Sequence, residues 1–425
     1  MENQTLIKNR NYLKFLSASS ISKFGDAIDS IALSWMIYVM TGSKMLMGTI
    51  FAVSFIPNLI FTPLGGIRAD KGSKKKQAIL GDMGRAVSVC IMGLLFYYDQ
   101  LEVWHIFLFT IINSTFESYS SPARGSLLPQ MIDESQFMKA SSLGSSVGTF
   151  SELIGLGVAG VIIANLGIAG AIFIDAATFL ASGLIMSSMR LAKDFKAPAT
   201  EKRGIQARLQ ETLAEMKEGF AYVHTKKLVL TLMVIAGFLN LSFVPFNVLR
   251  PVYVTEIMHM GAEGLSMTGI ALTLGIIIGG LLFAKVGDKI REILALTIGF
   301  IAMGASYAML GVVGWMGLKG QMILYIAVLF SFSFGFFLPF VQAPLQSVLL
   351  KSSDRDKLGR VIAVFTIIGL GAVPIGGMVV GFLGEWIPVE TLFALMGGLT
   401  VVVGIIAGIA LRKYWIEPVP QPVSE

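Results

Sequence analysis

Long apolar stretches recur along almost the whole chain and are separated by short polar connections. About 20 residues of α-helix cross the roughly 30 Å hydrocarbon core of a bilayer, so each stretch predicts one membrane-spanning helix. The pattern predicts twelve spans, at residues 14–41, 46–68, 77–97, 102–124, 139–166, 168–190, 228–254, 264–287, 292–314, 320–349, 358–383 and 389–411. The shortest connection, Leu166-Gly167, separates the fifth span from the sixth.

The composition supports a membrane setting for these helices. Hydrophobic residues make up 54% of the 425 residues and charged residues 14%, against roughly 25% charged in soluble proteins. A soluble fold cannot bury so much apolar surface, so the excess must face lipid. We therefore predict an all-α polytopic membrane protein.

The basic residues gather in alternate connections, and the opposite connections hold only Lys44 and Lys319. Because cationic loops stay on the cytoplasmic side, both termini are predicted to be cytoplasmic, in a multi-pass protein of the cell membrane. Topology thus accounts for the net charge of +6, and we expect no nucleic-acid partner. A monomer is expected.

Several chemistries find no support in the residue types present. Cys90 is a single cysteine, and the three histidines lie far apart in predicted loops, which argues against a metal site. No phosphate-cradling G-x-x-x-x-G-K-[ST] loop occurs, and no spacing of a nucleophile and a base appears in the spans. We expect neither a cofactor nor an enzymatic activity.

A hydrophilic stretch divides the chain into two halves. The predicted parts are an N-terminal bundle (1–191), a linker (192–227), a C-terminal bundle (228–413) and a disordered tail (414–425). Within the linker, apolar residues recur at helical spacing and predict either an amphipathic helix on the membrane surface or a solvated connector: Ile205, Leu209, Leu213, Met216 and Phe220.

A weak internal repeat supports this division. Gly65-Gly66 and Gly279-Gly280 end corresponding spans, and a lysine follows five positions after each pair, at Lys71 and Lys285.

The G-x-x-x-D-[RK] turn of Gly66, Asp70 and Lys71 resembles the loop signature of the major facilitator superfamily. Blocks at 121–129, 216–219, 358–361 and 374–377 are similar to its macrolide-efflux branch. The resemblance implies two six-helix bundles that alternate between outward-facing and inward-facing states. It also implies a conformational latch at Gly66, Asp70, Lys71, Lys74, Lys75 and Arg360. One departure is Leu156, where antiporters of the superfamily often carry proline.

Four carboxylates fall near the middle of predicted spans and are our candidates for proton coupling: Asp26, Asp29, Glu117 and Glu152. An ionisable residue inside a span costs roughly 2.5–3.5 kcal/mol to insert, so it faces a cavity or a partner. Lys23, three residues before Asp26, predicts an ion pair with it, whereas Glu117 and Glu152 have no basic residue within four positions. The alternative for each carboxylate is a purely structural pair.

The remaining charges in the spans are interpreted as structural. Asp175 lies closer to the outer end of its span, and Asp82 and Arg85, three residues apart, predict a pair on one helix surface. Arg250 is expected near the outer interface, where its side chain can extend toward water.

Polar and aromatic residues of the seventh and tenth spans suit a pocket for a large amphipathic ligand. The candidates for lining this cavity are Asn240, Phe243, Phe246, Asn247, Arg250, Phe336, Phe340 and Gln342. Most of the phenylalanines can equally face lipid or pack between helices.

The sequence therefore favours a proton-coupled exporter of small amphipathic molecules, of the macrolide or multidrug kind. Two alternatives stay open: a lipid or siderophore exporter on the same scaffold, and a membrane receptor or scaffold that transports nothing.

Overall fold

The computed structural model describes residues 6–133, 136–190, 218–318, 320–354 and 357–415. Within these ranges the secondary structure is helical and contains no strand. The predicted linker helix lies largely outside the described residues, because 191–217 are not among them, and so does most of the predicted tail.

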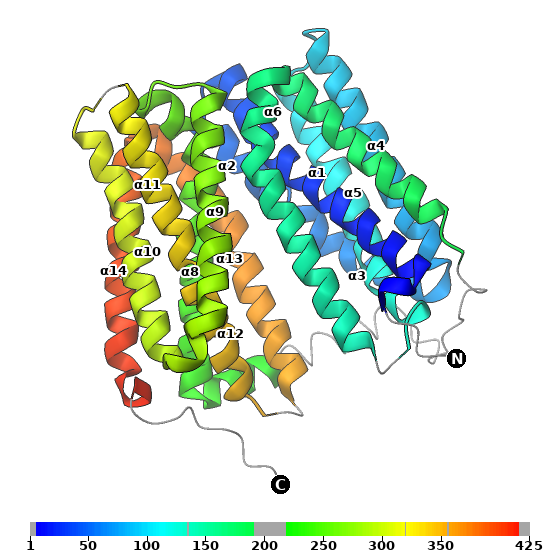
Figure 1. The fold of residues 1–425 in the computed structure, drawn as a ribbon. Helices are drawn as coiled ribbons and strands as arrows, with labels where there is room; N and C mark the ends of the chain where they lie inside the picture. The colour runs from blue at the N-terminus through cyan, green and yellow to red at the C-terminus, as the bar shows by residue number, and fades with distance from the viewer. Residues whose placement is uncertain (1–5, 134–135, 191–217, 319, 355–356, 416–425) are drawn as a thin grey trace. The chain divides into compact units, whose positions relative to one another are not determined.

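The first of two compact units comprises Met1–Gly42 and Ile50–Arg203. Its helices, shown from blue to green in Figure 1, are α1 (Arg10–Thr41), α3 (Ile56–Lys71), α4 (Lys74–Tyr97), α5 (Val103–Gly125) and α6 (Phe137–Ser187). Both ends of α1 carry sequence signals: the Asn9 side chain caps the first turn, and Gly42, at φ 64°, ends the helix in the left-handed conformation.

The second unit comprises Gly204–Glu425 together with Ser43–Thr49. Its helices in Figure 1 are α8 (Lys227–Val252), α9 (Ala262–Val286), α10 (Glu292–Trp315), α11 (Gln321–Phe337), α12 (Pro339–Lys351), α13 (Leu358–Trp386) and α14 (Val389–Ala410). The short helix α2 (Lys44–Val53) begins in this unit and ends in the first.

Residues 43–49 belong to the second unit because specific contacts hold them there. Glu385 of α13 accepts hydrogen bonds from the Met45 N–H and the Ser43 hydroxyl, at 2.9 and 2.8 Å. Lys44 forms a 2.9 Å ion pair with Glu256. Gly48 packs so closely on α13 that an added Cβ would lie 2.2 Å from the Gly377 carbonyl oxygen.

Eight helical segments in the described ranges are long and apolar enough to cross a membrane. One of them, α6, has 51 residues, enough for two of the predicted spans, and Gly167 interrupts it with φ 72° at the predicted connection. Helices α1 and α5 are 32 and 23 residues long but carry more polar and ionisable side chains. The count of twelve crossings stays a prediction.

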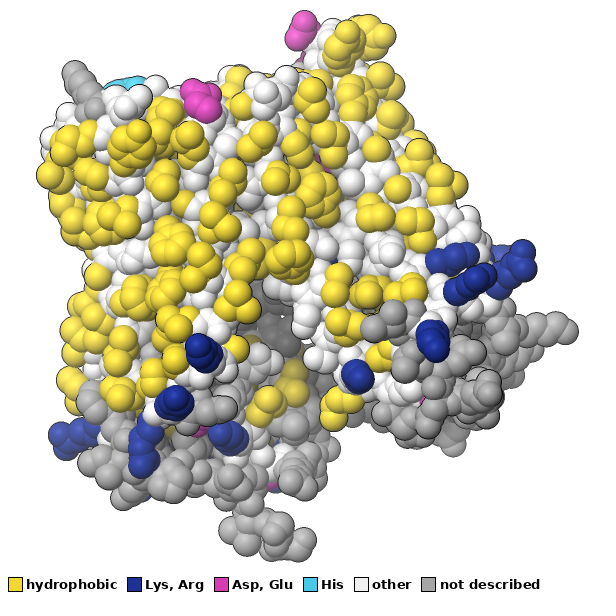
Figure 2. All heavy atoms as spheres, viewed as in Figure 1, with side chains coloured by type: hydrophobic (Ala, Val, Ile, Leu, Met, Phe, Trp, Pro, Cys, Tyr) yellow, Lys and Arg dark blue, Asp and Glu magenta, His cyan; other side chains and the backbone are white. Residues whose placement is uncertain are grey.

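The surface of the described helices agrees with a lipid-facing role. Figure 2 shows hydrophobic side chains along the helices that face the viewer, and Lys and Arg gathered toward one end of each unit. Among the exposed apolar residues are Leu281 on α9 and Ile375 on α13.

The repeated glycine pairs occupy the same kind of packing site in both units. A Cβ added to Gly65 of α3 would lie 2.5 Å from the Tyr119 carbonyl oxygen of α5, and one added to Gly279 of α9 would lie 2.1 Å from that of Phe336 on α11. The second glycines are open, since nothing lies within 4 Å at Gly66 and the nearest atom at Gly280 is 3.8 Å away. In each pair the first glycine lets two helix backbones approach.

We expect Gly279→Ala to destabilise the second unit by about 1–3 kcal/mol, because the added methyl group forces α9 and α11 apart. The neighbouring Gly280→Ala is the matched control and should leave stability nearly unchanged. Thermal unfolding of the purified protein in detergent measures both. Equal melting temperatures for the two variants would contradict the proposed packing role.

Candidate functional site

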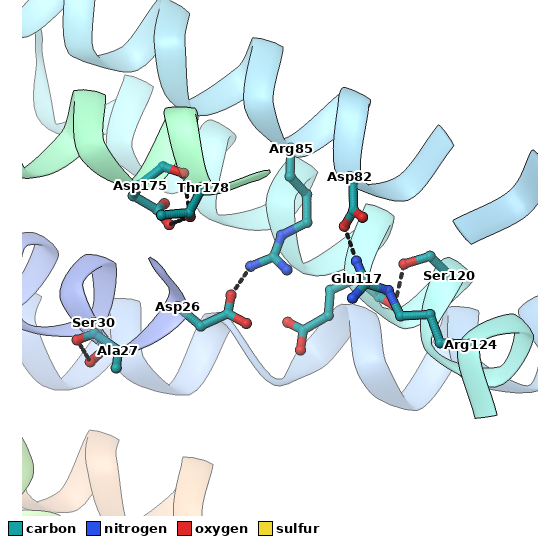
Figure 3. Close-up of polar contacts among 10 residues, drawn as sticks. All are labelled: Asp26, Ala27, Ser30, Asp82, Arg85, Glu117, Ser120, Arg124, Asp175 and Thr178. Atoms are coloured by element: carbon teal, nitrogen blue, oxygen red, sulfur yellow. Dashed lines mark hydrogen bonds and ion pairs between the residues drawn. The ribbon is translucent and has the colours of Figure 1, made fainter. Parts of the chain in front are cut away.

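Charged side chains from four helix segments meet inside the first unit. Asp26 of α1 forms an ion pair with Arg85 of α4 (Figure 3), and the Arg85 guanidinium also lies over the ring of Phe179 on α6, 3.9 Å from its centroid. The Arg85 side chain is 9% exposed and that of Asp26 is 32% exposed.

Close packing between α1 and α6 brings these groups together. A Cβ on Gly25 would lie 1.9 Å from Thr178 Oγ1 and 2.5 Å from Asp175 Oδ1, so only glycine fits at this position without a shift of its neighbours. Gly25 therefore places Asp26 of α1 directly beside the charged residues of α6.

A second ion pair lies next to the first. Asp82 of α4 is fully buried; one carboxylate oxygen pairs with Arg124 of α5 and the other accepts a 2.8 Å hydrogen bond from Ser182 of α6. The prediction that Asp82 and Arg85 pair on a helix surface is therefore wrong. Both are buried, and each takes its partner from another helix.

Lys23 pairs with Glu152 of α6, at 3.6 Å, and both side chains are about half exposed. The predicted pair of Lys23 with Asp26 is wrong, because Arg85 takes that carboxylate. Spacing along one helix cannot reveal a partner that approaches from another helix, and here that long-range partner is preferred.

Glu117 and Asp29 are the least satisfied of the four predicted proton-coupling carboxylates. Figure 3 shows the Glu117 carboxyl group on the same side of the site as Asp26 and Arg85, and the residue is exposed. Among the described residues its carboxylate has no ion-pair partner, and the buried Oδ1 of Asp29 has no hydrogen-bond partner. Electrostatic interactions nevertheless connect both residues with Arg85 and Asp26.

Asp175 is a member of this cluster that the sequence did not single out as functional. It is fully buried, one oxygen is 3.4 Å from the Thr178 hydroxyl, and Oδ2 has no hydrogen-bond partner in the described part of the chain. It interacts electrostatically with Asp29, Asp26 and Arg85. The available signal was an ionisable residue inside an apolar span, and this signal applies equally to Asp82 and Arg85.

Of the predicted latch, the structure describes only part. The side chains of Asp70, Lys71 and Arg360 lie outside the described residues. Lys75 Nζ is 2.7 Å from the carbonyl oxygens of Ser187 and Met189, where its charge suits the C-terminal end of α6. Lys74 Nζ is 3.5 Å from the Ser126 carbonyl oxygen.

The predicted cavity residues of the second unit fall into two groups. Phe246 and Phe340 are buried; Phe246 packs against the rings of Tyr307, Phe334 and Phe393, with centroids 5.1–6.1 Å apart. The others, apart from Arg250, are half-buried or exposed: Asn240, Phe243, Asn247, Phe336 and Gln342.

A model of the family described as the Major Facilitator Superfamily matches residues 15–373. The chain belongs to the major facilitator superfamily. It is therefore a multi-pass membrane transporter of a small molecule and not an enzyme. The family and the all-α fold predicted from the sequence are confirmed.

Curated relatives match over nearly the full length. Macrolide efflux protein A of Streptococcus pyogenes is 24% identical over 397 residues, which cover 93% of this chain and 95% of the relative. Multidrug efflux pump Tap of Mycolicibacterium fortuitum is 22% identical and covers 98% of this chain and 100% of its own.

Solved structures show the same fold. A bacterial homologue of the iron transporter ferroportin in an inward-facing state has a TM-score of 0.73 at 13% identity, with 97% of this chain and 100% of that chain covered. The nucleoside transporter NupG has a TM-score of 0.71 at 15% identity, with 96% and 100% covered. At these identities the likeness concerns the fold alone.

We expect Arg124→Gln to destabilise the first unit strongly, by about 3–5 kcal/mol, because it leaves the Asp82 carboxylate buried without its cation. Lys23→Gln breaks a half-exposed pair and should cost less than about 1 kcal/mol. Melting temperatures of the two purified variants in one detergent provide the comparison. Wild-type stability of Arg124→Gln would show that the Asp82–Arg124 pair does not hold α4 to α5.

Proposed function

We propose that this transporter exports amphipathic small molecules in exchange for protons, by alternating access. The observation that carries the proposal is the charge balance of the cluster in the first unit. The cluster contains two cations, Lys23 and Arg85, and five carboxylates: Asp26, Asp29, Glu117, Glu152 and Asp175. If all were ionised, five negative and two positive charges would leave a net charge of −3.

Such an excess of like charge is unfavourable at membrane depth, where the effective dielectric constant is low. Protons bound by the carboxylates relieve it. Glu117 is the best candidate to exchange a proton with water, since its side chain is exposed and has no ion-pair partner among the described residues. Glu152 is less suited to this role, because Lys23 already compensates its charge.

Arg85 supplies a route from proton binding to conformational change. Its guanidinium pairs with Asp26 and interacts electrostatically with Glu117 and Asp175. When one of these carboxylates takes up a proton, its attraction for Arg85 weakens, and the guanidinium is attracted more strongly to the carboxylates that remain ionised. These carboxylates belong to α1, α5 and α6, so the preferred partner of Arg85 determines which helices are held together.

The direction of transport and the class of substrate are supported by the relatives, whose names describe macrolide and multidrug efflux. The proposal includes a monomer in the cell membrane with both termini in the cytoplasm, and a latch that involves Gly66, Asp70, Lys71, Lys74, Lys75 and Arg360. Exposed Asn247 and Gln342 of the second unit are the polar candidates for contact with substrate.

We expect Glu117→Gln to abolish uphill export driven by a pH gradient while downhill exchange of the same substrate continues. The amide keeps the size of the side chain and its capacity for hydrogen bonds but cannot release a proton. Everted membrane vesicles with a fluorescent amphipathic dye, assayed with and without a pH gradient, separate the two activities.

Glu152→Gln is the matched control, since it removes a carboxylate that Lys23 compensates, and it should retain most of the uphill activity. Wild-type uphill export by Glu117→Gln, with an unchanged pH dependence, would exclude Glu117 as the coupling residue. No effect of the pH gradient on the wild-type protein would contradict proton coupling altogether.

A further inference from the structure

The prediction that Arg250 on α8 extends toward water is wrong: it is a buried cation with no counter-ion among the described residues. The residue is 6% exposed, and its Nη2 atom has no hydrogen-bond partner among the described residues. No carboxylate in the described part of the chain forms an ion pair with it. Within the described ranges its one charge-related contact is the ring of Phe246, whose centroid lies 5.7 Å from the guanidinium carbon.

Two other arginines, the buried Arg85 and the partly buried Arg124, show the counter-ion that Arg250 lacks among the described residues. Arg85 and Arg124 each face a carboxylate from a neighbouring helix. A guanidinium cannot lose its proton in a protein, so burial does not neutralise Arg250. An uncompensated buried charge costs several kcal/mol, and an anion that enters the site would recover much of that cost.

The helix is irregular where Arg250 lies. Pro245 and Pro251 occur inside α8, and a π-helical turn over Tyr253–Ile257 follows it. Proline lacks an N–H and leaves the carbonyl group one turn earlier without its helical hydrogen bond. Broken and π-helical backbone at membrane depth is tolerated where it lines a cavity, and it recurs at ligand sites of transporters.

Further unsatisfied hydroxyl groups lie near the same face of α8. Ser242 precedes Phe246 and Arg250 by one and two turns, and its buried hydroxyl has no hydrogen-bond partner among the described residues. The same holds for the hydroxyl of Tyr307, whose ring is 6.0 Å from that of Phe246. At 1.5 Å per residue, Ser242 and Arg250 are about 12 Å apart along the helix. Among the described residues, this region thus offers one cation and two unsatisfied hydroxyl groups beside buried aromatic rings, and no carboxylate pairs with the cation.

From these observations we propose that Arg250 binds the oxyanion, a carboxylate or a phosphate, of an amphipathic ligand. The inference rests on the proposed function in taking the transported molecule as this ligand. It places acidic amphiphiles within the proposed substrate class, since their oxyanion would compensate the charge of the guanidinium. An anionic lipid headgroup carries the same chemistry.

The test compares three probes with one alkyl chain and different head groups: dodecanoate, its methyl ester and dodecylamine. Binding of radiolabelled probe is measured on the purified full chain in phosphatidylcholine nanodiscs, with empty nanodiscs as background. The wild-type protein should bind dodecanoate at least about tenfold more tightly than the other two probes. Tenfold in Kd corresponds to about 1.4 kcal/mol, a modest share of a buried charge pair.

Arg250→Gln should remove this preference and leave binding of the methyl ester unchanged, and Arg250→Lys should retain part of it. Arg412→Gln, which removes an exposed arginine of the same unit, is the matched control and should behave as the wild type. Arg250→Gln should also melt at or above the wild-type temperature, because it removes an uncompensated charge. If Arg250 had a purely structural role, Arg250→Gln would instead lower the melting temperature and weaken the binding of all three probes equally.

Phosphatidylglycerol added to the nanodiscs distinguishes the two sources of the oxyanion. If phosphatidylglycerol competes with dodecanoate in the wild type but not in Arg250→Gln, the site binds a lipid headgroup. If it does not compete in the wild type, the site binds the transported amphiphile. Equal affinity of the wild type for dodecanoate and its methyl ester would overturn the inference. If the wild type binds dodecanoate and its methyl ester equally but still transports dodecylamine in a proton-driven manner, the proposed function stands and only this inference fails. If it binds the oxyanion but shows no proton-driven transport, the proposed function fails and this inference stands.

Discussion

The cost of burying charge is the constraint on which the first unit depends. Asp82 is fully buried and is tolerable only because Arg124 and Ser182 satisfy both of its oxygens. Each partner comes from a different helix, so satisfying this one carboxylate fixes α4, α5 and α6 against one another. The Asp26–Arg85 pair then joins α1 to the same set. In a lipid environment, where apolar burial gives little net attraction between helices, such polar contacts determine which helices associate.

Hydropathy predicted the helices well because lipid exposure imposes a simple rule on composition. The rule is local, since it concerns how many consecutive residues are apolar, and α8, α9, α10 and α14 follow it closely. The glycine pairs could be recognised from the sequence as an internal repeat, whereas their role in close helix approach became visible only in the packing. Ion-pair partners could not be predicted in this way. Arg85 pairs with a residue 59 positions away and Arg124 with one 42 positions away, so the choice depends on how the helices pack.

The same reason explains which parts of the candidate site the sequence missed. Asp26, Asp29, Glu117 and Glu152 stood out as carboxylates near the middle of predicted spans. Asp175 and Arg85 did not, because their distance from the span ends suggested ordinary structural roles. The packing of the helices shows that Arg85 has more than a structural role on one helix, because its guanidinium lies among Asp26, Glu117 and Asp175. The chemical character of such a cluster depends on its total charge, and a helix considered alone cannot reveal that total.

The two units share a packing scheme and differ in the chemistry of their interiors. Gly65 and Gly279 make the same kind of helix contact, at corresponding positions of the repeat. Around that common frame the first unit gathers an excess of carboxylates, whereas the described residues of the second unit bury clustered aromatic rings and the cation Arg250. An excess of negative charge suits the binding of protons, and an uncompensated guanidinium beside aromatic rings suits an acidic amphiphile. On the proposed function, the repeated scaffold therefore carries the driving ion in one half and the charged end of the substrate in the other.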